Sequence, residues 1–313
     1  MKKIFIDGKD GTTGLKIYSR FEHRNDIELL LIDPEKRKDP RERARLINES
    51  DFTFLCLPDQ ASREAVALVE NDKVKIIDTS TAHRTLPDWA YGFAELSDEH
   101  RAKIAQSNRI AVPGCYASGF NSIVYPLIHN NLISSNYDIV CFAMSGYTGA
   151  GKKGIAQYED ENRDSELDSP RIYALTQEHK HLKEMKAISG LSKAPIFSPI
   201  ICDYPQGMVV SVPLYTDKMT KKYTPADICE MFKEHYAGSD IVKVREIGYT
   251  QAMIGTNNFA DRDDMEIEIN GNDDRIIITS RFDNLGKGAS GAAIQCLNIA
   301  MGIDEKTGLN IGE

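Results

Sequence analysis

Short apolar runs and helical segments alternate through the first 115 residues of the chain. The runs are rich in β-branched residues and lie at 3–8, 27–33, 52–58, 74–80 and 109–114. Most are separated by segments with helical character, such as 13–24, 61–71 and 98–107. Nearly continuous apolar strands separated by helices are typical of a parallel sheet covered on both faces. This part of the chain is therefore predicted to form an α/β, Rossmann-like, doubly wound parallel sheet domain.

The pattern changes after about residue 135. Longer strand candidates follow at 137–145, 207–215, 265–270 and 275–282, and the last two alternate apolar and polar residues. A period of two is expected for antiparallel strands with one solvated face. Helices are predicted near 178–189 and 224–236, and 288–302 forms a helix of small residues. The second part is therefore predicted to be an α+β domain with a mixed or antiparallel sheet.

Three glycines lie between the first strand and the first helix. Gly8, Gly11 and Gly14 have the spacing G-x-x-G-x-x-G, which differs from the usual G-x-G-x-x-G. Glycine lets the backbone turn tightly and approach a pyrophosphate bound at the helix N-terminus. An ordinary tight turn is the alternative, but three glycines at this place in a βαβ unit favour nucleotide binding.

The residues after the second strand leave the choice of cofactor open. Asp33 ends the run at 27–33, where a carboxylate binds the ribose hydroxyls of NAD. Three cations follow at once and could pair with the 2′-phosphate of NADP: Lys36, Arg37 and Lys38. A basic loop is also common as plain solvated surface, so the residues alone favour neither cofactor.

A second glycine-rich stretch begins at Gly146. Residues 146–152 fit the pattern G-x-x-x-x-G-K, but Lys153 stands where a P-loop needs Ser or Thr to hold Mg²⁺. The stretch also lies outside the first βα unit. It is predicted to line an active site and not to bind ATP.

Cys115 lies between a short strand and a helix, in the sequence Pro-Gly-Cys. A thiol at a helix N-terminus experiences the positive end of the helix dipole, which favours the nucleophilic thiolate. The neighbouring amides could also form an oxyanion hole. A cysteine is more often a small buried hydrophobe, but this position favours a nucleophile.

A catalytic thiolate usually needs an imidazole for proton transfer. His179 and His181 form an H-x-H pair, which two metal ligands could also explain. No third ligand lies at a recognisable spacing, so no metal is predicted. His83 and Arg84 follow the fourth strand, at the edge of the sheet where ligands bind. Arg84 could hold an anionic group or be a surface arginine.

Composition narrows the class of protein. The 313 residues are 41% hydrophobic and 27% charged, and 38 basic against 47 acidic residues give a net charge of −9. This balance argues against nucleic acid or an anionic membrane as the main partner. Six cysteines with no C-x-x-C, and no signal-peptide or membrane segment, favour a cytoplasmic protein.

These motifs together resemble the short form of the N-acetyl-γ-glutamyl-phosphate reductase family. The resemblance covers nearly the whole chain and includes the glycine turn, "DTSTAHR" (78–84), "YGFAEL" (91–96), "RIAVPGCYASG" (109–119), "SGYTGAGKKG" (145–154), "HKHLKEM" (179–185) and residues 283–302. It implies the fold of glyceraldehyde-phosphate and aspartate-semialdehyde dehydrogenases, in which the closing helix packs on the cofactor domain. The expected domains are then 1–115 with 284–313 for the dinucleotide, and 116–283 for catalysis and dimerisation.

The resemblance also implies a reaction. Cys115 would attack the acyl phosphate of N-acetyl-glutamyl 5-phosphate, NADPH would reduce the thioester, and His179 would act as acid/base. The full set of expected cofactor contacts is Gly8, Gly11, Thr12, Thr13, Gly14, Asp33, Lys36, Arg37, Lys38, Ser145, Gly146 and Asn284. The expected substrate contacts are Arg84, Tyr116 and Ser118. NADP(H) and a homo-oligomer are the expected cofactor and assembly.

The chain departs from the longer form of the family at Pro205-Gln206-Gly207, where that form has an arginine. Three other interpretations remain. Aspartate-semialdehyde dehydrogenase would use the same chemistry on a shorter acid. A cofactor-free cysteine acyl hydrolase would not need the glycine turn, and a nucleotide sensor would leave Cys115 and His179 without a role.

Overall fold

The computed structural model describes residues 1–250 and 252–312, which form two compact units. The first contains Met1–Gly114 and Ala289–Leu309, and the second contains Cys115–Gly288 and the residues from Asn310. Across the described residues, no helix is long and apolar enough to span a membrane.

The first unit is built on a six-stranded sheet with the order β2-β1-β3-β4-β6-β5, in which every pair is parallel. Its strands are β1 (Lys2–Asp7), β2 (Ile27–Leu30), β3 (Phe52–Leu55), β4 (Lys75–Asp78), β5 (Ala90–Tyr91) and β6 (Arg109–Ala111). The parallel sheet predicted from the alternating pattern is confirmed. The chain adds β2 on one side of β1 and β3 on the other, so the topological switch point lies between β1 and β3.

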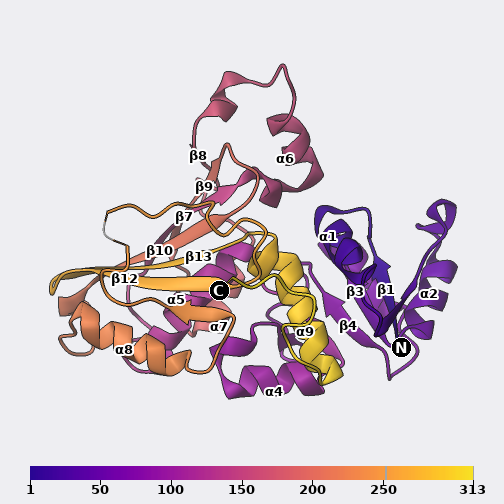
Figure 1. Cartoon of the computed structure of the whole chain (residues 1–313), viewed down its shortest axis with the longest axis horizontal. Coiled ribbons are helices and arrows are strands. Elements are labelled where there is room, and N and C mark those ends of the chain that lie inside the picture. Colours follow the sequence, from indigo (N-terminus) through magenta and orange to yellow (C-terminus); the bar gives the residue numbers. More distant parts are fainter. Residues whose placement is uncertain (251, 313) are drawn as a thin grey trace. The chain divides into compact units, whose positions relative to one another are not determined.

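Helices cover both faces of this sheet (Figure 1). On one face, α1 (Thr12–Phe21), α4 (Asp98–Gln106) and α9 (Gly291–Met301) bury an apolar cluster that includes Ile17, Ile104 and Leu297. On the other, α2 (Pro40–Glu49) and α3 (Asp59–Ala67) pack through Ile47 and Ala65. The apolar strands are buried on both sides because two helical layers enclose them.

The second unit is built on a seven-stranded mixed sheet with the order β11-β12-β13-β10-β7-β9-β8. Its strands are β7 (Val140–Gly146), β8 (Arg171–Ile172), β9 (Ile196–Cys202), β10 (Met208–Tyr215), β11 (Val242–Val244), β12 (Met265–Gly271) and β13 (Arg275–Phe282). The sequence pattern gave no indication of β9, which runs parallel to β7. Helices α5 (Cys115–His129) and α8 (Pro225–His235) pack on one side, and α7 (Leu182–Ser189) packs against α5. A further helix, α6 (Gly151–Tyr158), follows β7.

One expectation for this sheet is wrong. The alternating polar residues of β12 and β13 do not face solvent, because Glu266, Glu268 and Arg281 are 2%, 3% and 7% exposed. Arg281 pairs with both glutamates, and Arg245 also pairs with Glu266. These charged side chains can be buried because they neutralise each other. The alternation of apolar and polar residues in the sequence does not reveal this pairing.

Candidate active site

The glycine turn after β1 depends on close backbone approach. Gly8 has a φ of 87°, and a Cβ atom there would lie 2.3 Å from the carbonyl oxygen of Cys56. A Cβ on Gly14 would lie 2.5 Å from the carbonyl oxygen of Gly8. Helix α1 begins at Thr12, so the amides of Thr12 and Thr13 belong to its first turn, where no helical carbonyl can accept from them. The turn therefore offers a pyrophosphate the donors that it needs.

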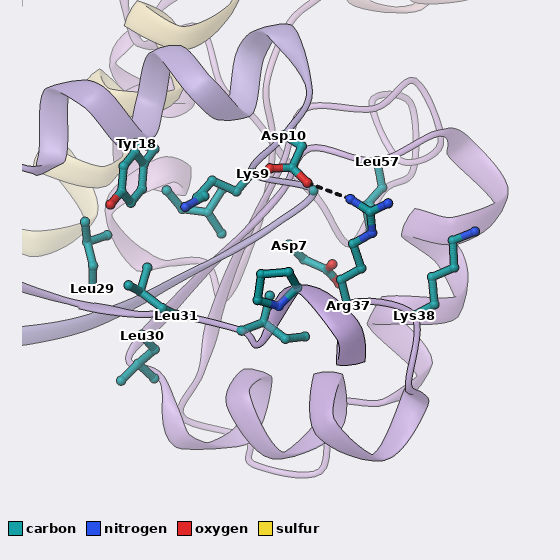
Figure 2. A pocket seen from close by; sticks show the side chains of 14 residues that line it. Asp7, Lys9, Asp10, Tyr18, Leu29, Leu30, Leu31, Arg37, Lys38 and Leu57 are labelled. Carbon is teal, nitrogen blue, oxygen red and sulfur yellow. Dashed lines mark hydrogen bonds and ion pairs between the residues drawn. The ribbon is translucent and has the colours of Figure 1, made fainter.

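Beside this turn lies a cavity of about 290 Å³ (Figure 2). Gly8, Lys9, Arg37 and Lys38 line it, together with apolar residues of 29–32. Arg37 Nη1 lies 2.9 Å from Asp10 Oδ2. The Lys9 ammonium group lies 4.0 Å from the ring centre of Tyr18, which also lines the cavity. The cavity thus combines an apolar wall with cations at its rim.

Of the predicted cofactor residues that follow the second strand, Arg37 and Lys38 line this cavity, whereas Asp33 and Lys36 do not. Strand β2 ends at Leu30, three residues before Asp33. The Asp33 carboxylate instead accepts a hydrogen bond of 3.0 Å from the amide of Glu35 and caps a short 3₁₀ helix, Pro34–Lys36. This local capping is common for aspartate, and it turns the chain so that Arg37 and Lys38 reach the cavity.

A buried ion pair supports the turn from below. Asp7, at the end of β1, accepts a hydrogen bond of 2.9 Å from Nε of Arg43 on α2. Burial raises the pKa of Asp7, although Arg43 acts in the opposite direction. Asp7 also lines the cavity, so this ion pair connects α2 to the wall of the cavity.

These features fit a nicotinamide dinucleotide. At Gly8 and Gly14, any Cβ atom would occupy space that the backbone already fills. The helix amides can hold the pyrophosphate, and the apolar wall of the cavity can pack against a nucleotide base. The sequence did not single out Lys9 or Tyr18; their positions inside and just after the glycine motif were the available signal.

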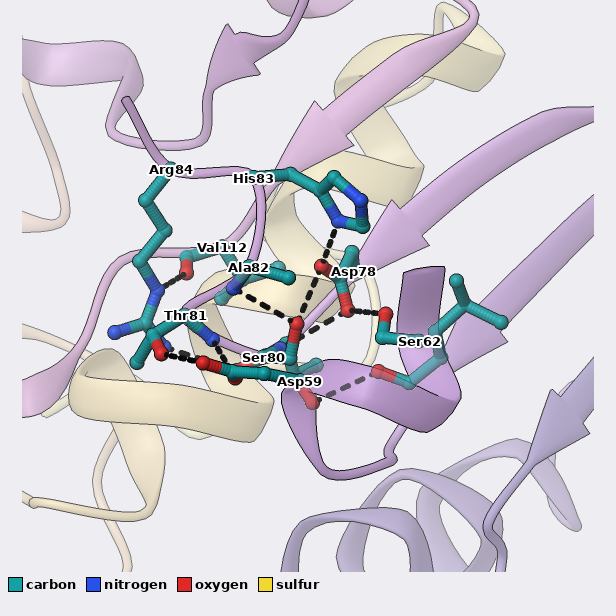
Figure 3. Close-up of polar contacts among 11 residues, drawn as sticks. Asp59, Ser62, Asp78, Ser80, Thr81, Ala82, His83, Arg84 and Val112 are labelled. Carbon is teal, nitrogen blue, oxygen red and sulfur yellow. Dashed lines mark hydrogen bonds and ion pairs between the residues drawn. The ribbon is translucent and has the colours of Figure 1, made fainter. Parts of the chain in front are cut away.

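The "DTSTAHR" motif forms a buried polar network after β4 (Figure 3). The Asp78 carboxylate accepts from the Ser62 hydroxyl at 2.7 Å and from the amide and hydroxyl of Ser80 at 3.0 and 2.7 Å. Its Oδ2 also lies 2.6 Å from His83 Nδ1, and the His83 ring stacks on Trp89. A fully buried carboxylate with four partners fixes the conformation of the loop that follows it.

Arg84 is the last residue of this motif, and it is 8% exposed. Its Nε donates to the carbonyl oxygen of Val112 at 2.8 Å, and Nη2 donates to that of Thr79 at 2.9 Å. Val112 is three residues before Cys115 in the chain. The guanidinium is therefore anchored at the C-terminal edge of the parallel sheet and holds the backbone that leads to the thiol.

Cys115 is the first residue of α5 and is half-buried. Gly288 packs directly against it, since a Cβ on Gly288 would lie 2.9 Å from Cys115 Cβ. In the next turn of the helix, the Ser118 hydroxyl is buried and has no hydrogen-bond partner within residues 1–250 and 252–312. The predicted placement of the thiol at a helix N-terminus is confirmed.

Tyr116 joins the thiol to the rest of the site. The centre of its ring lies 6.4 Å from that of Tyr173. Burial is the main cause that raises the pKa of both phenols, and the charge of a Cys115 thiolate raises both further. Both phenols are therefore protonated donors close to the sulfur. Tyr173, which directly follows β8, was not predicted, because no local pattern marks it.

His179 lies against Tyr116, with ring centres 5.7 Å apart, and also contacts Tyr173 and Phe197. It precedes α7, which begins at Leu182, later than the predicted start. Burial and the neighbouring Lys180 charge lower the pKa of His179 to about 4. Its Nδ1 accepts a hydrogen bond of 3.1 Å from the amide of His181, so the neutral ring carries its proton on Nε2. Among the described residues, no group of three or more His, Cys, Asp or Glu could hold a metal.

Asn284 and Gly146 lie where three loops meet. Asn284 Oδ1 accepts from the amide of Gly207 at 2.9 Å, and its Nδ2 donates to Thr148 Oγ1 at 3.0 Å. A Cβ on Gly146 would lie 2.4 Å from the carbonyl oxygen of Pro205. Gln206 donates to Asp261 at 2.7 Å and to Asp283 at 3.1 Å, which braces the loop that departs from the long form.

Two family models match the chain. "Semialdehyde dehydrogenase, NAD binding domain" matches residues 6–104, and "Semialdehyde dehydrogenase, dimerisation domain" matches residues 115–284. Proteins named N-acetyl-gamma-glutamyl-phosphate reductase are similar over nearly the whole length. That of Sinorhizobium fredii is 45% identical over 303 residues, covering 96% of this chain and 98% of its own. That of Brucella ovis is 42% identical over 306 residues, covering 96% and 99%.

Solved structures show the same fold. Aspartate semialdehyde dehydrogenase II of Vibrio cholerae, complexed with ASA, has a TM-score of 0.72 at 15% identity, covering 96% of this chain and 98% of its own. The aspartate semialdehyde dehydrogenase of Francisella tularensis has a TM-score of 0.71 at 14% identity, covering 96% and 100%.

Proposed function

The chain belongs to the N-acetyl-γ-glutamyl-phosphate reductase family, and from that premise we propose that it reduces N-acetyl-L-glutamyl 5-phosphate to the 5-semialdehyde in arginine biosynthesis. The chain is an oxidoreductase that uses a nicotinamide cofactor. The first unit would bind the dinucleotide and the second would carry catalysis and dimerisation. The observation that carries the proposal is Cys115 at the start of α5, with Tyr116 packed against His179.

The chemistry begins at the thiol. The Cys115 thiolate attacks the acyl-phosphate carbon, the bond from that carbon to the phosphate oxygen breaks, and a thioester remains. When bound, the nicotinamide cofactor supplies the hydride that reduces this thioester. The carbonyl double bond then re-forms as the carbon–sulfur bond breaks, which releases the Cys115 thiolate and the aldehyde. His179 is the proposed acid/base, and the Nε2–H of its neutral ring would donate a hydrogen bond to the substrate oxygen.

We propose NADP(H) as the cofactor, because Arg37 and Lys38 line the cavity whereas Asp33 caps a helix. Charge-assisted hydrogen bonds from these cations would hold the 2′-phosphate. Gly8, Gly11, Thr12, Thr13 and Gly14 would hold the pyrophosphate. Lys36, Ser145, Gly146 and Asn284 remain proposed cofactor contacts.

For the substrate, we propose contacts from Tyr116, Ser118 and Arg84. The buried hydroxyl of Ser118 supports its role, because it has no partner among the described residues and a buried hydroxyl without a partner costs free energy. Arg84 is fixed by the carbonyls of Thr79 and Val112 and would attract the phosphate group.

A homo-oligomer is proposed because strands β7–β9 leave apolar side chains exposed. Val140, Ile172 and Ile196 are 39%, 56% and 61% exposed on these strands. A second copy of the chain would cover them. A cytoplasmic location is supported by the cysteines, all six of which are described and form no disulfide.

The decisive experiment combines a variant with a panel of substrates. Cys115→Ser should abolish turnover while the cofactor still binds, and near-normal turnover would refute the thioester route. The wild type should reduce NADP in the presence of phosphate and N-acetylglutamate 5-semialdehyde. Preference for aspartate 4-semialdehyde would instead assign the chain to the sibling activity.

A further inference from the structure

The chain between β8 and α7 carries both Tyr173 and His179 and is held in an uncommon conformation. Ala174 and Gln177 have positive φ values of 54° and 59°. Residues other than glycine rarely adopt this region, and each such position costs on the order of 1 kcal/mol. The amide of Gln177 donates to the carbonyl of Ala174 at 2.9 Å, which closes a tight turn. Other contacts must hold this turn in place.

The side chain of Gln177 provides such a contact. Its Nε2 donates to the carbonyl oxygen of Phe197 at 2.8 Å, and its Oε1 accepts from the amide of Phe197 at 2.9 Å. Phe197 lies on β9 opposite Cys141 of β7, whereas β8 pairs with β9 only at Ile200 and Ile201. The side-chain amide thus takes the place of a strand neighbour at the edge of β9, where β8 has already ended.

The same residue of β9 also contacts the imidazole. The Phe197 ring lies 5.3 Å from the ring of His179 and 5.2 Å from that of Tyr116. Phe197 is 1% exposed, so its position is fixed by the core. Its backbone holds Gln177 while its side chain supports the ring two residues further along the chain.

We propose that Gln177 is a positioning residue for His179, because its paired hydrogen bonds to Phe197 hold the strained turn that places the imidazole against Tyr116. This role rests on the proposed function only in that His179 serves the reaction. Gln177 is itself exposed. Loss of the pair would release the turn and let the imidazole move into solvent.

The titration of His179 reports this directly. The groups around its ring are Tyr116 from α5, Tyr173 after β8, and Lys180 and His181 before α7. In Gln177→Leu, which keeps the size of the side chain but makes neither hydrogen bond, the pKa of His179 should rise from about 4 towards the free value of about 6.5. NMR of the C2 protons of the cofactor-free protein measures it, with His179→Asn assigning the signal.

Activity provides the second readout. A displaced catalytic group of this kind slows the chemical step by roughly 10–100-fold, so kcat should fall while the Kd for NADPH is unchanged. Gln177→Glu keeps the acceptor and loses the donor, and should fall between the wild type and Gln177→Leu at neutral pH. Glu178→Leu, an exposed neighbour in the same turn, is the matched control and should behave as the wild type.

An unchanged His179 titration in Gln177→Leu would overturn the inference, whatever the activity. If Cys115→Ser remains active while the titration still shifts, the proposed function fails and the positioning role stands. If Cys115→Ser is inactive and the titration does not shift, only the positioning role fails.

Discussion

Arg281 of β13 neutralises two glutamates that the alternating pattern of β12 predicts to be solvated. It pairs with Glu266 and with Glu268, the latter at 2.7 Å, and all three side chains are less than a tenth exposed. Glu266 keeps Arg245 as a second partner, whereas Glu268 keeps the Thr250 hydroxyl at 2.9 Å. Replacing Arg281 by methionine would therefore leave Glu268 as a buried charge without a cation.

The size of the effect follows from this burial. Removing one partner of a buried ion pair costs roughly 3–5 kcal/mol, because the remaining charge is not solvated. A domain of this size loses about 2–4 °C of melting temperature per kcal/mol, so Arg281→Met should lower Tm by about 6–20 °C. Arg275→Met is the matched control, since Arg275 lies on the same strand but is exposed and should cost less than about 0.5 kcal/mol.

The dependence on pH gives a second test. Burial raises the pKa of Glu266, but its hydrogen bonds to Arg245 and Arg281 together lower the pKa by more than burial raises it. The net pKa therefore lies below the usual value. A group with a lowered folded pKa contributes stability that is present above the unfolded pKa, near 4.3, and is lost as pH falls through the folded value. Without Arg281, one of the two partners that lower the pKa of Glu266 is lost, so the burial that raises this pKa has a larger effect. The gap in Tm between variant and wild type should therefore narrow as pH falls from 7 towards 5.

Thermal unfolding followed by circular dichroism measures both effects, and Arg281→Met/Glu268→Gln should recover part of the loss because it removes the stranded charge. Equal Tm values for Arg281→Met and Arg275→Met at pH 7 would refute the reasoning about this cluster. A Tm difference between Arg281→Met and the wild type that widens on acidification would refute it as well.

The remaining predictions concern the cofactor cavity. Gly8→Ala should weaken cofactor binding at least 10-fold in a fluorescence titration, because its Cβ would lie 2.3 Å from the Cys56 carbonyl oxygen. Gly238→Ala is its control, since Gly238 has a similar φ of 78° with nothing within 4 Å, and equal binding by the two variants would contradict the argument. Arg37→Ser/Lys38→Ser should raise the Kd for NADPH by about 10–100-fold with little change for NADH, because two charge-assisted bonds to the 2′-phosphate are lost. Arg41→Ser, an exposed neighbour outside the cavity lining, controls for charge, and a parallel loss of NADH binding would argue against phosphate recognition.

Local features of the chain made much of the first unit predictable. Apolar β-branched runs and the helices between them follow from side-chain periodicity, and they correspond to the parallel sheet. The glycine turn and Cys115 at the start of α5 could also be located, because a strand-to-helix junction is encoded within about ten residues. Asp33 shows where local patterns fail to predict the structure. It was expected at the end of the second strand, but β2 ends at Leu30 and Asp33 caps the turn that follows.

The alternation in β12 and β13 determined which residues share a face, but only the tertiary structure decided that this face is buried. Periodicity describes one strand, whereas the burial of a charge depends on the partners that other segments supply, here Arg245 and Arg281 for Glu266. The same holds for the site in the second unit. Tyr173, His179 and Phe197 meet Tyr116 from distant parts of the chain, and the His181 amide selects the tautomer of His179. The sequence by itself determined the thiol and its helix; the folded chain decided which groups surround it, because those contacts join residues that no local pattern connects.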